Sequence, residues 1–357
     1  MSPTPTPPPD PMEAPNPRVP AGGPHPPEGP EPPAWALPGR PVFRKRDDLP
    51  GATALEAHAL TWLAEAMPDG GALVVPVRTG PGWLIEPRLS AAAVTASAAR
   101  AFGRALAVTH AAGAPAFGAA PPGWDGRTQM GRCDVRLRPH APEDPGAPPR
   151  RWGEFFAADR LAPYLRPCRD SGALSPGGVR VLEAVCSRLS DGELDAEQPA
   201  LVRQEARRRG ESVAVARTHG DLWCGNVLWV PAAQVAAWAP TAAGPGREPK
   251  ARAGRRVEGA GGGGGSSGGP GPSGDVVGVL IDPLAHGAHA ETDLAALGVF
   301  GQRHLEQIVA GYQEVSPLAP GWRERVGLHQ LHMLIIHAYL FGGGYGAQTV
   351  AAARRYA

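Results

Sequence analysis

The stretch THGDLWCGNVLW, residues 218–229, places an acid and a carboxamide five positions apart in an otherwise apolar run. Transfer of a γ-phosphoryl group needs a base for the attacking hydroxyl, cations on the phosphates and oxygen ligands for magnesium. Asp221 and Asn226 have the separation at which one loop offers a base and a metal ligand to the same phosphate. The spacing predicts a phosphoryl-transfer loop, and a structural turn containing Asp and Asn is the alternative.

Two further features are expected with such a loop. Asp282 ends the apolar run VVGVLIDP and fits a second magnesium ligand at the tip of a buried strand. Lys45, followed by Glu56 in the next helical pattern, fits the ion pair that holds the α- and β-phosphates. Each has an ordinary alternative: Asp282 before Pro283 could simply end a strand, and Lys45 could be a solvated charge. The combination in this order favours the phosphoryl-transfer interpretation.

The elements that must position these groups form two regions. Residues 41–90 show the pattern of a strand, a helix over TALEAHALTWLAEAM, and a hairpin of ALVVPV with GWLIEPRLS around a turn at 79–82. From residue 91 the apolar spacing is helical, beginning with a helix over 91–113. We therefore predict an α+β fold, with a small N-terminal α/β lobe at 41–90 and a larger, mostly helical C-terminal lobe at 91–357.

Within the larger lobe, the segments WGEFFAADRLAPYL and VRVLEAVCSRLSDG are predicted helices, broken near Pro163 and Gly192. The run VVGVLIDP is predicted to be a buried strand. The chain then closes with DLAALGVFGQRHLEQIVAGY and WRERVGLHQLHMLIIHAYLF, and both have helical periodicity.

Glycine and proline, 48 and 43 of the 357 residues, are concentrated in two blocks. Residues 1–40 contain 16 prolines and almost no aliphatic side chains, so they cannot bury enough surface to offset the entropy of ordering. Residues from about 235 to 275 contain GGGGGSSGG and resemble a flexible insert in the C-terminal lobe. We expect the first block to be a disordered, proline-rich segment.

Charge and composition argue against several classes of protein. The formal net charge is +1, and the one basic cluster lies in the glycine-rich insert, so nucleic acid is not an expected partner. Neither a secretory signal nor an apolar run of 18 residues is found, so we expect a cytoplasmic protein without a membrane partner. The four cysteines are far apart without metal-binding spacing and are expected to be free thiols.

The motif THGDLWCGNVLW resembles the HGDLWxGN motif of the fructosamine kinases (ketosamine 3-kinases), within the aminoglycoside phosphotransferase and choline kinase superfamily. Other similar segments are VFRKRD, LEAHAL, IDPLAHGAHAETDLA and the C-terminal GYQEVSPLAPGWRERVGLHQLHMLIIHAYLFGGGY. The resemblance covers about residues 41–350 apart from the insert. It implies a two-lobed protein-kinase-like fold, ATP and Mg²⁺ as cofactors, and a small-molecule or protein-bound glycated amine as substrate. A monomer is favoured.

Position by position, the resemblance implies a role for each candidate residue. Asp221 would be the catalytic base, Asn226 and Asp282 would bind magnesium, and Lys45 with Glu56 would hold the phosphates. Adenine would lie against the segment after WLIEPRL, in contact with backbone groups near Glu86 and Arg88. Asp293 would support the catalytic loop. Trp223 is a candidate wall of the sugar site, with core packing as an equal alternative.

One part of the sequence departs from the family pattern. Relatives begin with two strands joined by a glycine-containing phosphate loop, whereas VPAGGPHPPEGPEPPAWALPGRPVF contains prolines that remove strand hydrogen-bond donors. Three functions therefore stay open: phosphorylation of a sugar hydroxyl on glycated amines, as in protein deglycation; a related kinase acting on an aminoglycoside or a choline-type compound; and a pseudokinase impaired by the altered phosphate loop.

Overall fold

The computed structural model describes residues 34–36, 41–141, 148–240 and 275–357. Most of the proline-rich segment and residues 241–274 of the glycine-rich insert, both expected to be flexible, lie outside the described residues. One short part of the proline-rich segment is described and is ordered: η2 (Ala34–Ala36) is a 3₁₀ turn beside strand β4, and Trp35 is only 8% exposed. A large aromatic side chain gains enough from burial to fix a turn within a proline-rich context.

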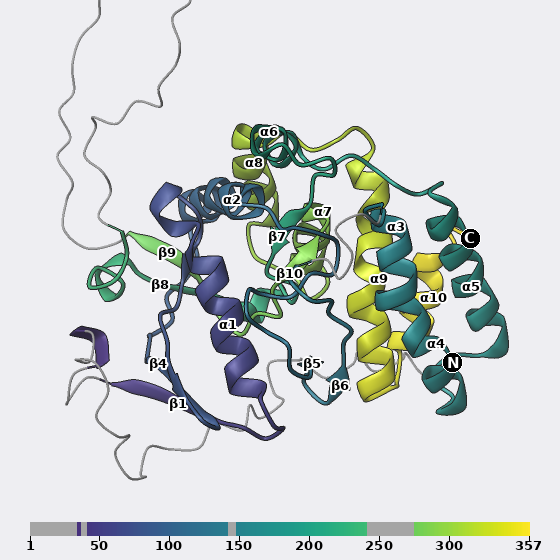
Figure 1. The fold of residues 1–357 in the computed structure, drawn as a ribbon, viewed down its shortest axis with the longest axis horizontal. Helices are drawn as coiled ribbons and strands as arrows, with labels where there is room; N and C mark the ends of the chain where they lie inside the picture. The colour runs from purple at the N-terminus through teal and green to yellow at the C-terminus, as the bar shows by residue number, and fades with distance from the viewer. Residues whose placement is uncertain (1–33, 37–40, 142–147, 241–274) are drawn as a thin grey trace, which may run out of the picture.

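The N-terminal region contains a three-stranded antiparallel sheet with helix α1 beside it (Figure 1). Its strands are β1 (Val42–Arg46), β3 (Arg78–Gly80) and β4 (Trp83–Pro87), in the order β1-β4-β3. Helix α1 (Ala52–Ala64) begins where Asp47 accepts hydrogen bonds from the backbone N–H groups of Gly51 and Thr53, at 2.9 and 2.8 Å. A carboxylate that satisfies these first donors fixes the start of the helix.

The predicted hairpin between ALVVPV and GWLIEPRLS is wrong in its first strand. Residues 78–80, not 72–77, form the hairpin with β4. Strand β2 (Leu73–Val74) instead pairs in parallel with β9 (Val276–Leu280), and β8 (Val227–Pro231) pairs with β9 on its other side. Strand partners distant in sequence cannot be identified from local alternation alone. This three-stranded sheet joins the N-terminal region, through β2, to the C-terminal region, through β8 and β9.

The C-terminal region consists mainly of helices, which lie above and to the right of the sheets in Figure 1. The predicted helix over 91–113 begins later, because Thr95 caps it and residue Ala92 contacts β8 through its backbone. The helices are α2 (Ala96–Ala111), α3 (Trp152–Phe155), α4 (Ala162–Asp170), α5 (Pro176–Asp191), α6 (Ala200–Arg209), α7 (Ala290–Leu297), α8 (Leu305–Val315), α9 (Trp322–Phe341) and α10 (Tyr345–Ala353).

Two helix predictions need correction. The break expected near Pro163 is absent, because a π-helical turn (Phe156–Leu161) joins α3 to α4 and Pro163 lies in the first turn of α4, where a missing N–H is tolerated. The segment DLAALGVFGQRHLEQIVAGY forms two helices, α7 and α8, separated at Gly301 and His304, both of which have positive φ. Helix α6 was not predicted, since it has only two buried residues. The end of α5 at Gly192 was predicted correctly.

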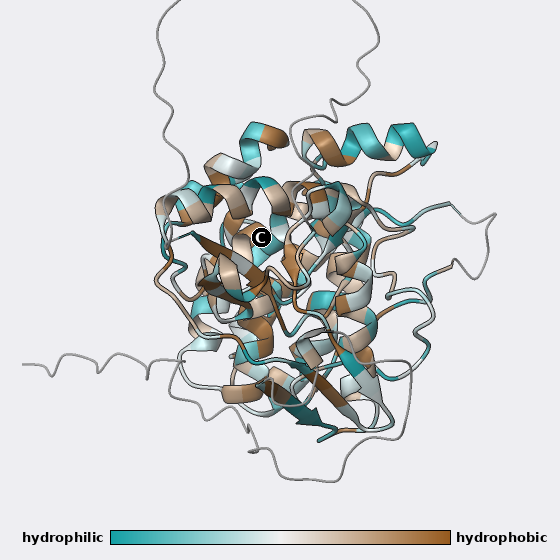
Figure 2. Cartoon of the chain, turned by 90° about the vertical axis from the view of Figure 1, so that its left-hand side faces the viewer, coloured by the Kyte–Doolittle hydropathy of each residue, from teal (hydrophilic) through white to brown (hydrophobic). Residues whose placement is uncertain are grey.

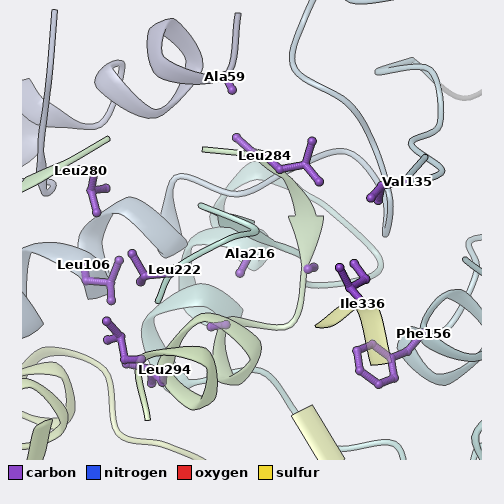
Figure 3. Packing of buried hydrophobic residues seen from close by; sticks show 14 of the residues in the cluster. Ala59, Leu106, Val135, Phe156, Ala216, Leu222, Leu280, Leu284, Leu294 and Ile336 are labelled. Carbon is purple, nitrogen blue, oxygen red and sulfur yellow. The ribbon is translucent and has the colours of Figure 1, made fainter. Parts of the chain in front are cut away.

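A single apolar core connects the two regions. Figure 3 shows Ala59 of α1, Leu280 of β9, Leu106 of α2 and Leu222 of the 218–226 loop among its members. Helices α2 and α8 come unusually close, since a Cβ on Gly103 would lie 1.9 Å from the Ile308 carbonyl oxygen. Apolar segments are concentrated inside and polar ones outside (Figure 2). The 218–226 loop is therefore anchored, through Leu222, in a well-packed interior.

The observed architecture is α+β, with a small strand-containing region and a larger helical one, as predicted. All four cysteines are free, which confirms that expectation. Among the described residues, no helix has the length and apolar character needed to cross a membrane.

Candidate active site

The loop between β7 (Ala216–Thr218) and β8 carries the HGDLWCGN motif, and the carboxylate of Asp293 binds its backbone. Asp293 of α7 accepts hydrogen bonds from the backbone N–H of His219 (2.6 Å) and of Gly220 (3.0 Å). Its Oδ2 also lies 3.2 Å from Nε2 of the buried His110. Burial raises the pKa of Asp293, but these hydrogen bonds outweigh it and keep the pKa below its usual value. Asp293 therefore supports the loop as an ionised anchor.

Gly220 allows the loop to turn in a confined space. Its φ is +81°, and a Cβ at this position would lie 2.1 Å from the backbone oxygen of Leu284. Any other residue would combine a strained backbone with a steric clash. The glycine between His219 and Asp221 is thus a requirement of the turn.

His219 fixes the loop through hydrogen bonds at both ring nitrogens. Its Nε2 lies 2.9 Å from the Ile281 carbonyl oxygen, and its Nδ1 accepts from the backbone N–H of Asp221 at 3.3 Å. Burial lowers its pKa, which keeps the imidazole neutral with the proton on Nε2. The ring connects the loop to the end of strand β9 and fixes the direction in which Asp221 leaves the backbone.

Three polar residues expected to act together do converge. Asn226 Nδ2 donates to the backbone oxygen of Asp221 at 2.8 Å, to Asp221 Oδ2 at 3.1 Å and to the Asp282 backbone oxygen at 3.4 Å. Asp282 has a φ of 52°, a left-handed conformation that Asp tolerates better than most residues. Strain of this kind is common at functional sites, where the surroundings hold an unusual backbone in place.

Lys45 of β1 lies within a cluster of carboxylates. Its Nζ contacts Glu56 of α1 at 2.5 Å, contacts Asp282 directly, and lies 3.9 Å from Glu86 of β4. Burial alone would lower the Lys45 pKa, but the attraction of Glu56, Asp282 and Glu86 outweighs it and raises the pKa above its usual value. The predicted Lys45–Glu56 pair is present, and Lys45 also joins the N-terminal sheet to the end of β9.

The carboxylate of Glu86 belongs to the cluster around Lys45, which the sequence did not indicate. We expected its backbone to contact adenine, whereas its buried carboxylate joins the cluster around Lys45. An acid in an otherwise apolar strand, WLIEP, is the signal that could have found it. The backbone N–H of Arg88 donates to the Pro41 carbonyl at 2.9 Å, so any contact of Arg88 with adenine would use another of its groups.

The charges at the site are unbalanced. Glu56, Glu86, Asp221 and Asp282 carry four negative charges when ionised, and Lys45 supplies one positive charge. Burial raises the pKa of Asp221 to about 7, and the nearby Asp282 adds to this effect, while the Asn226 hydrogen bond opposes it. Carboxylate and amide oxygens are the ligands that Mg²⁺ prefers. Burial also raises the pKa of Glu56, so these carboxylates resist being ionised together without a further cation, and the donor set fits a divalent one.

Trp223 lies on the surface side of the loop. Its backbone N–H donates to the Asp221 oxygen at 3.1 Å, and its ring packs over Gly225, where a Cβ would lie 2.2 Å from the ring. The ring meets Phe300 edge to face, with 5.7 Å between centroids. The side chain is half-buried, so it both packs on the loop and retains an accessible surface.

Comparisons with known proteins agree with this geometry. A family model described as fructosamine kinase matches residues 56–250 and 263–356. The "probable ketoamine kinase" of Klebsiella aerogenes is 29% identical over 199 residues, which is 56% of this chain and 47% of that protein. A second one, from Synechocystis, is 27% identical over 247 residues, covering 69% of this chain and 58% of that protein. The matched region thus spans about half the length of these curated relatives.

Solved structures extend the likeness to three dimensions. The crystal structure of a "putative fructosamine-3-kinase" from Thermobifida fusca has a TM-score of 0.62 and 34% identity, covering 89% of this chain and 86% of that one. A similarly described protein from Haemophilus somnus, with a TM-score of 0.55 and 16% identity, shares the fold. With the HGDLWCGN loop, its acidic anchor and the Lys45–Glu56 pair, these matches show that the chain belongs to the fructosamine kinase family and has its protein-kinase-like fold.

Proposed function

We propose that the protein transfers the γ-phosphoryl group of ATP to a sugar hydroxyl of a glycated amine, at the third carbon of the sugar. The observation that carries the proposal is the meeting of Asp221, Asn226 and Asp282 beside Lys45. Family membership supports kinase chemistry. Phosphorylation at this carbon would allow the adduct to decompose and release the amine, so the cellular role would be deglycation, in the cytoplasm.

Asp221 is assigned the role of base. Its carboxylate would accept a hydrogen bond from the attacking hydroxyl and take its proton as the new bond to phosphorus forms. The Asn226 amide fixes the carboxylate through the 3.1 Å contact with Oδ2. In the ligand-free site, burial and the nearby Asp282 raise the pKa of Asp221, so its carboxylate accepts a proton more readily than an exposed one would.

Asn226 and Asp282 are assigned to the magnesium ion. Since Asn226 donates through Nδ2, its Oδ1 is the atom that would face a cation. When bound, Mg²⁺ would neutralise charge that develops on the phosphate oxygens. Lys45, held by Glu56 and next to Asp282, would contact the α- and β-phosphates.

The two lobes would divide these tasks. Residues 41–90 would bind the nucleotide, with adenine against the segment near Glu86 and Arg88, and residues 91–357 would supply the catalytic loop and the substrate site. Trp223 would place its accessible ring against the C–H face of the sugar. A monomer is proposed.

The proposal can be tested by phosphoryl transfer from ATP to fructosylated or ribosylated lysine, detected as the sugar phosphate by phosphorus NMR. Asp221→Asn should lower kcat by about 10²–10⁴-fold, as loss of a general base does. Asp170→Asn, at an exposed acid of α4 paired with Arg169, is the matched control and should retain full activity. Turnover by Asp221→Asn at the wild-type rate would refute the assignment of the base.

A substrate panel separates the remaining possibilities. Activity on aminoglycosides or choline-type amines, without activity on glycated amines, would reject the proposed acceptor while keeping the phosphotransferase. Thermal stabilisation by ATP and magnesium without transfer to any acceptor would instead indicate a pseudokinase.

A further inference from the structure

Five aromatic rings, each in contact with at least one of the others, extend from the 218–226 loop across the surface of the larger lobe. Trp223 meets Phe300 at 5.7 Å between centroids, Phe300 meets His337 at 4.9 Å, and His337 meets both Tyr345 at 5.2 Å and Phe341 at 5.5 Å. The rings come from the loop, from the turn after α7, from α9 and from the start of α10. We call this set the aromatic row.

Burial distinguishes the aromatic row from ordinary core packing. Phe341 is 68% exposed, and the other four side chains are half-buried. A second group of contacting rings, by contrast, is completely enclosed: its members are Trp152, Phe156, His289 and His329. The aromatic row therefore presents ring faces and edges to solvent, at a cost in hydrophobic free energy that internal packing does not explain.

The aromatic row begins in the loop that carries Asp221. Trp223 follows Asp221 by two residues, its backbone N–H donates to the Asp221 backbone oxygen, and the thiol of Cys224 contacts the Phe300 carbonyl oxygen at 3.6 Å. Phe341 is separated from Trp223 by Phe300 and His337, with steps of 5.7, 4.9 and 5.5 Å between successive centroids. With Trp223 as the proposed wall of the sugar site, a sugar held at Asp221 would place its substituent beside these rings.

We propose that the aromatic row binds the amine arm of the substrate, with the protonated secondary amine of the glycated compound held over the rings by cation–π attraction. The inference rests on the proposed function, because the sugar must be held at Asp221. A secondary alkylamine is protonated at neutral pH, and aromatic faces attract such cations. His337 does not compete, since burial lowers its pKa and leaves the ring neutral.

The test is calorimetric titration of the full-length protein with two matched compounds. One is a 1-alkylamino-1-deoxyfructose, which carries the ammonium, and the other is the 1-O-alkyl ether of fructose with the same alkyl chain. Wild-type protein should bind the ammonium compound several-fold more tightly. Phe341→Leu keeps an apolar side chain but removes the ring, and it should weaken binding of the ammonium compound about two- to fivefold while leaving the ether unchanged.

Tyr339→Leu is the matched control. Tyr339 is also an exposed aromatic residue of α9, at 40%, but its ring lies against Tyr164 and not in the aromatic row. This variant should bind both compounds as wild type does. Equal affinity of wild-type protein for the two compounds, binding of neither compound, or unchanged affinity in Phe341→Leu would each overturn the inference, as would a shift in sedimentation showing that Phe341 joins two copies of the chain.

Binding is measured without turnover, so the two proposals can fail separately. If the wild-type protein discriminates between the compounds but transfers no phosphoryl group, the proposed function is wrong and the amine site stands. If it phosphorylates glycated amines yet binds the ether equally well, the proposed function stands and the amine site is wrong.

Discussion

Removing the charge of Asp221 should make the ligand-free protein more stable while removing its activity. The carboxylate lies beside Asp282, and burial together with this neighbour raises its pKa from 3.8 to about 7. In the unfolded chain the same group ionises near its usual pKa. Keeping Asp221 ionised therefore costs free energy in the folded state, and Asp221→Asn removes this cost. The Asn side chain can still accept the hydrogen bond from Asn226.

The size of the effect follows from the linkage between protonation and folding. A pKa difference from 3.8 to about 7 corresponds to about 4 kcal/mol at 1.36 kcal/mol per pKa unit. Asp221 is only half-buried, so solvent screening reduces the expected gain in the free energy of unfolding to about 1–2 kcal/mol. A raised pKa of an acid destabilises the folded state above the unfolded pKa. The penalty therefore grows between about pH 4 and pH 7 and is constant above this range.

The assay is urea denaturation of wild-type and Asp221→Asn protein, without nucleotide or metal, at pH 7.5 and pH 5. The variant should be more stable at pH 7.5, and its advantage should be smaller at pH 5, closer to the pKa of the unfolded chain, where protonation of the folded wild-type group relieves part of the penalty. Asp293→Asn is a control of opposite sign, because this acid accepts two backbone N–H groups and its pKa is lowered. It should lose about 2 kcal/mol. Asp221→Asn destabilising the protein at pH 7.5 would refute the electrostatic reasoning.

Three other predictions concern the same site. Gly220→Ala should lower the free energy of unfolding by more than about 4 kcal/mol or prevent soluble expression, because its Cβ would lie 2.1 Å from a carbonyl oxygen. Gly210 has a similar φ and no atom within 4 Å of a Cβ, so Gly210→Ala should lower it by only about 1 kcal/mol in the same urea denaturation assay. Lys45→Met should lower the free energy of unfolding by about 3 kcal/mol and raise the KM for ATP, measured by denaturation and steady-state kinetics. Asn226→Ala should abolish the increase in Tm that magnesium and ATP together give to wild type in a thermal shift assay, and an undiminished increase would argue against Asn226 as a ligand.

Local chemistry was predictable from the sequence where the signal lay within a few residues. The spacing of Asp221 and Asn226, the strand before Asp282 and the helix that carries Glu56 were all found in this way, because turns, strand patterns and helix periods are encoded over short stretches. The order of elements was sufficient to predict the α+β architecture with its smaller N-terminal region.

Only the tertiary structure decided how distant segments meet. Strand β2 pairs with β9 about 200 residues away, the Glu86 carboxylate joins Lys45 and Asp282, and the aromatic row forms from four separate elements. The sequence by itself determined which groups are present and how each element displays them. Which of several similar strands or rings becomes a neighbour depends on the free energy of the whole fold, because competing local pairings differ by only a fraction of a kcal/mol to about 1 kcal/mol.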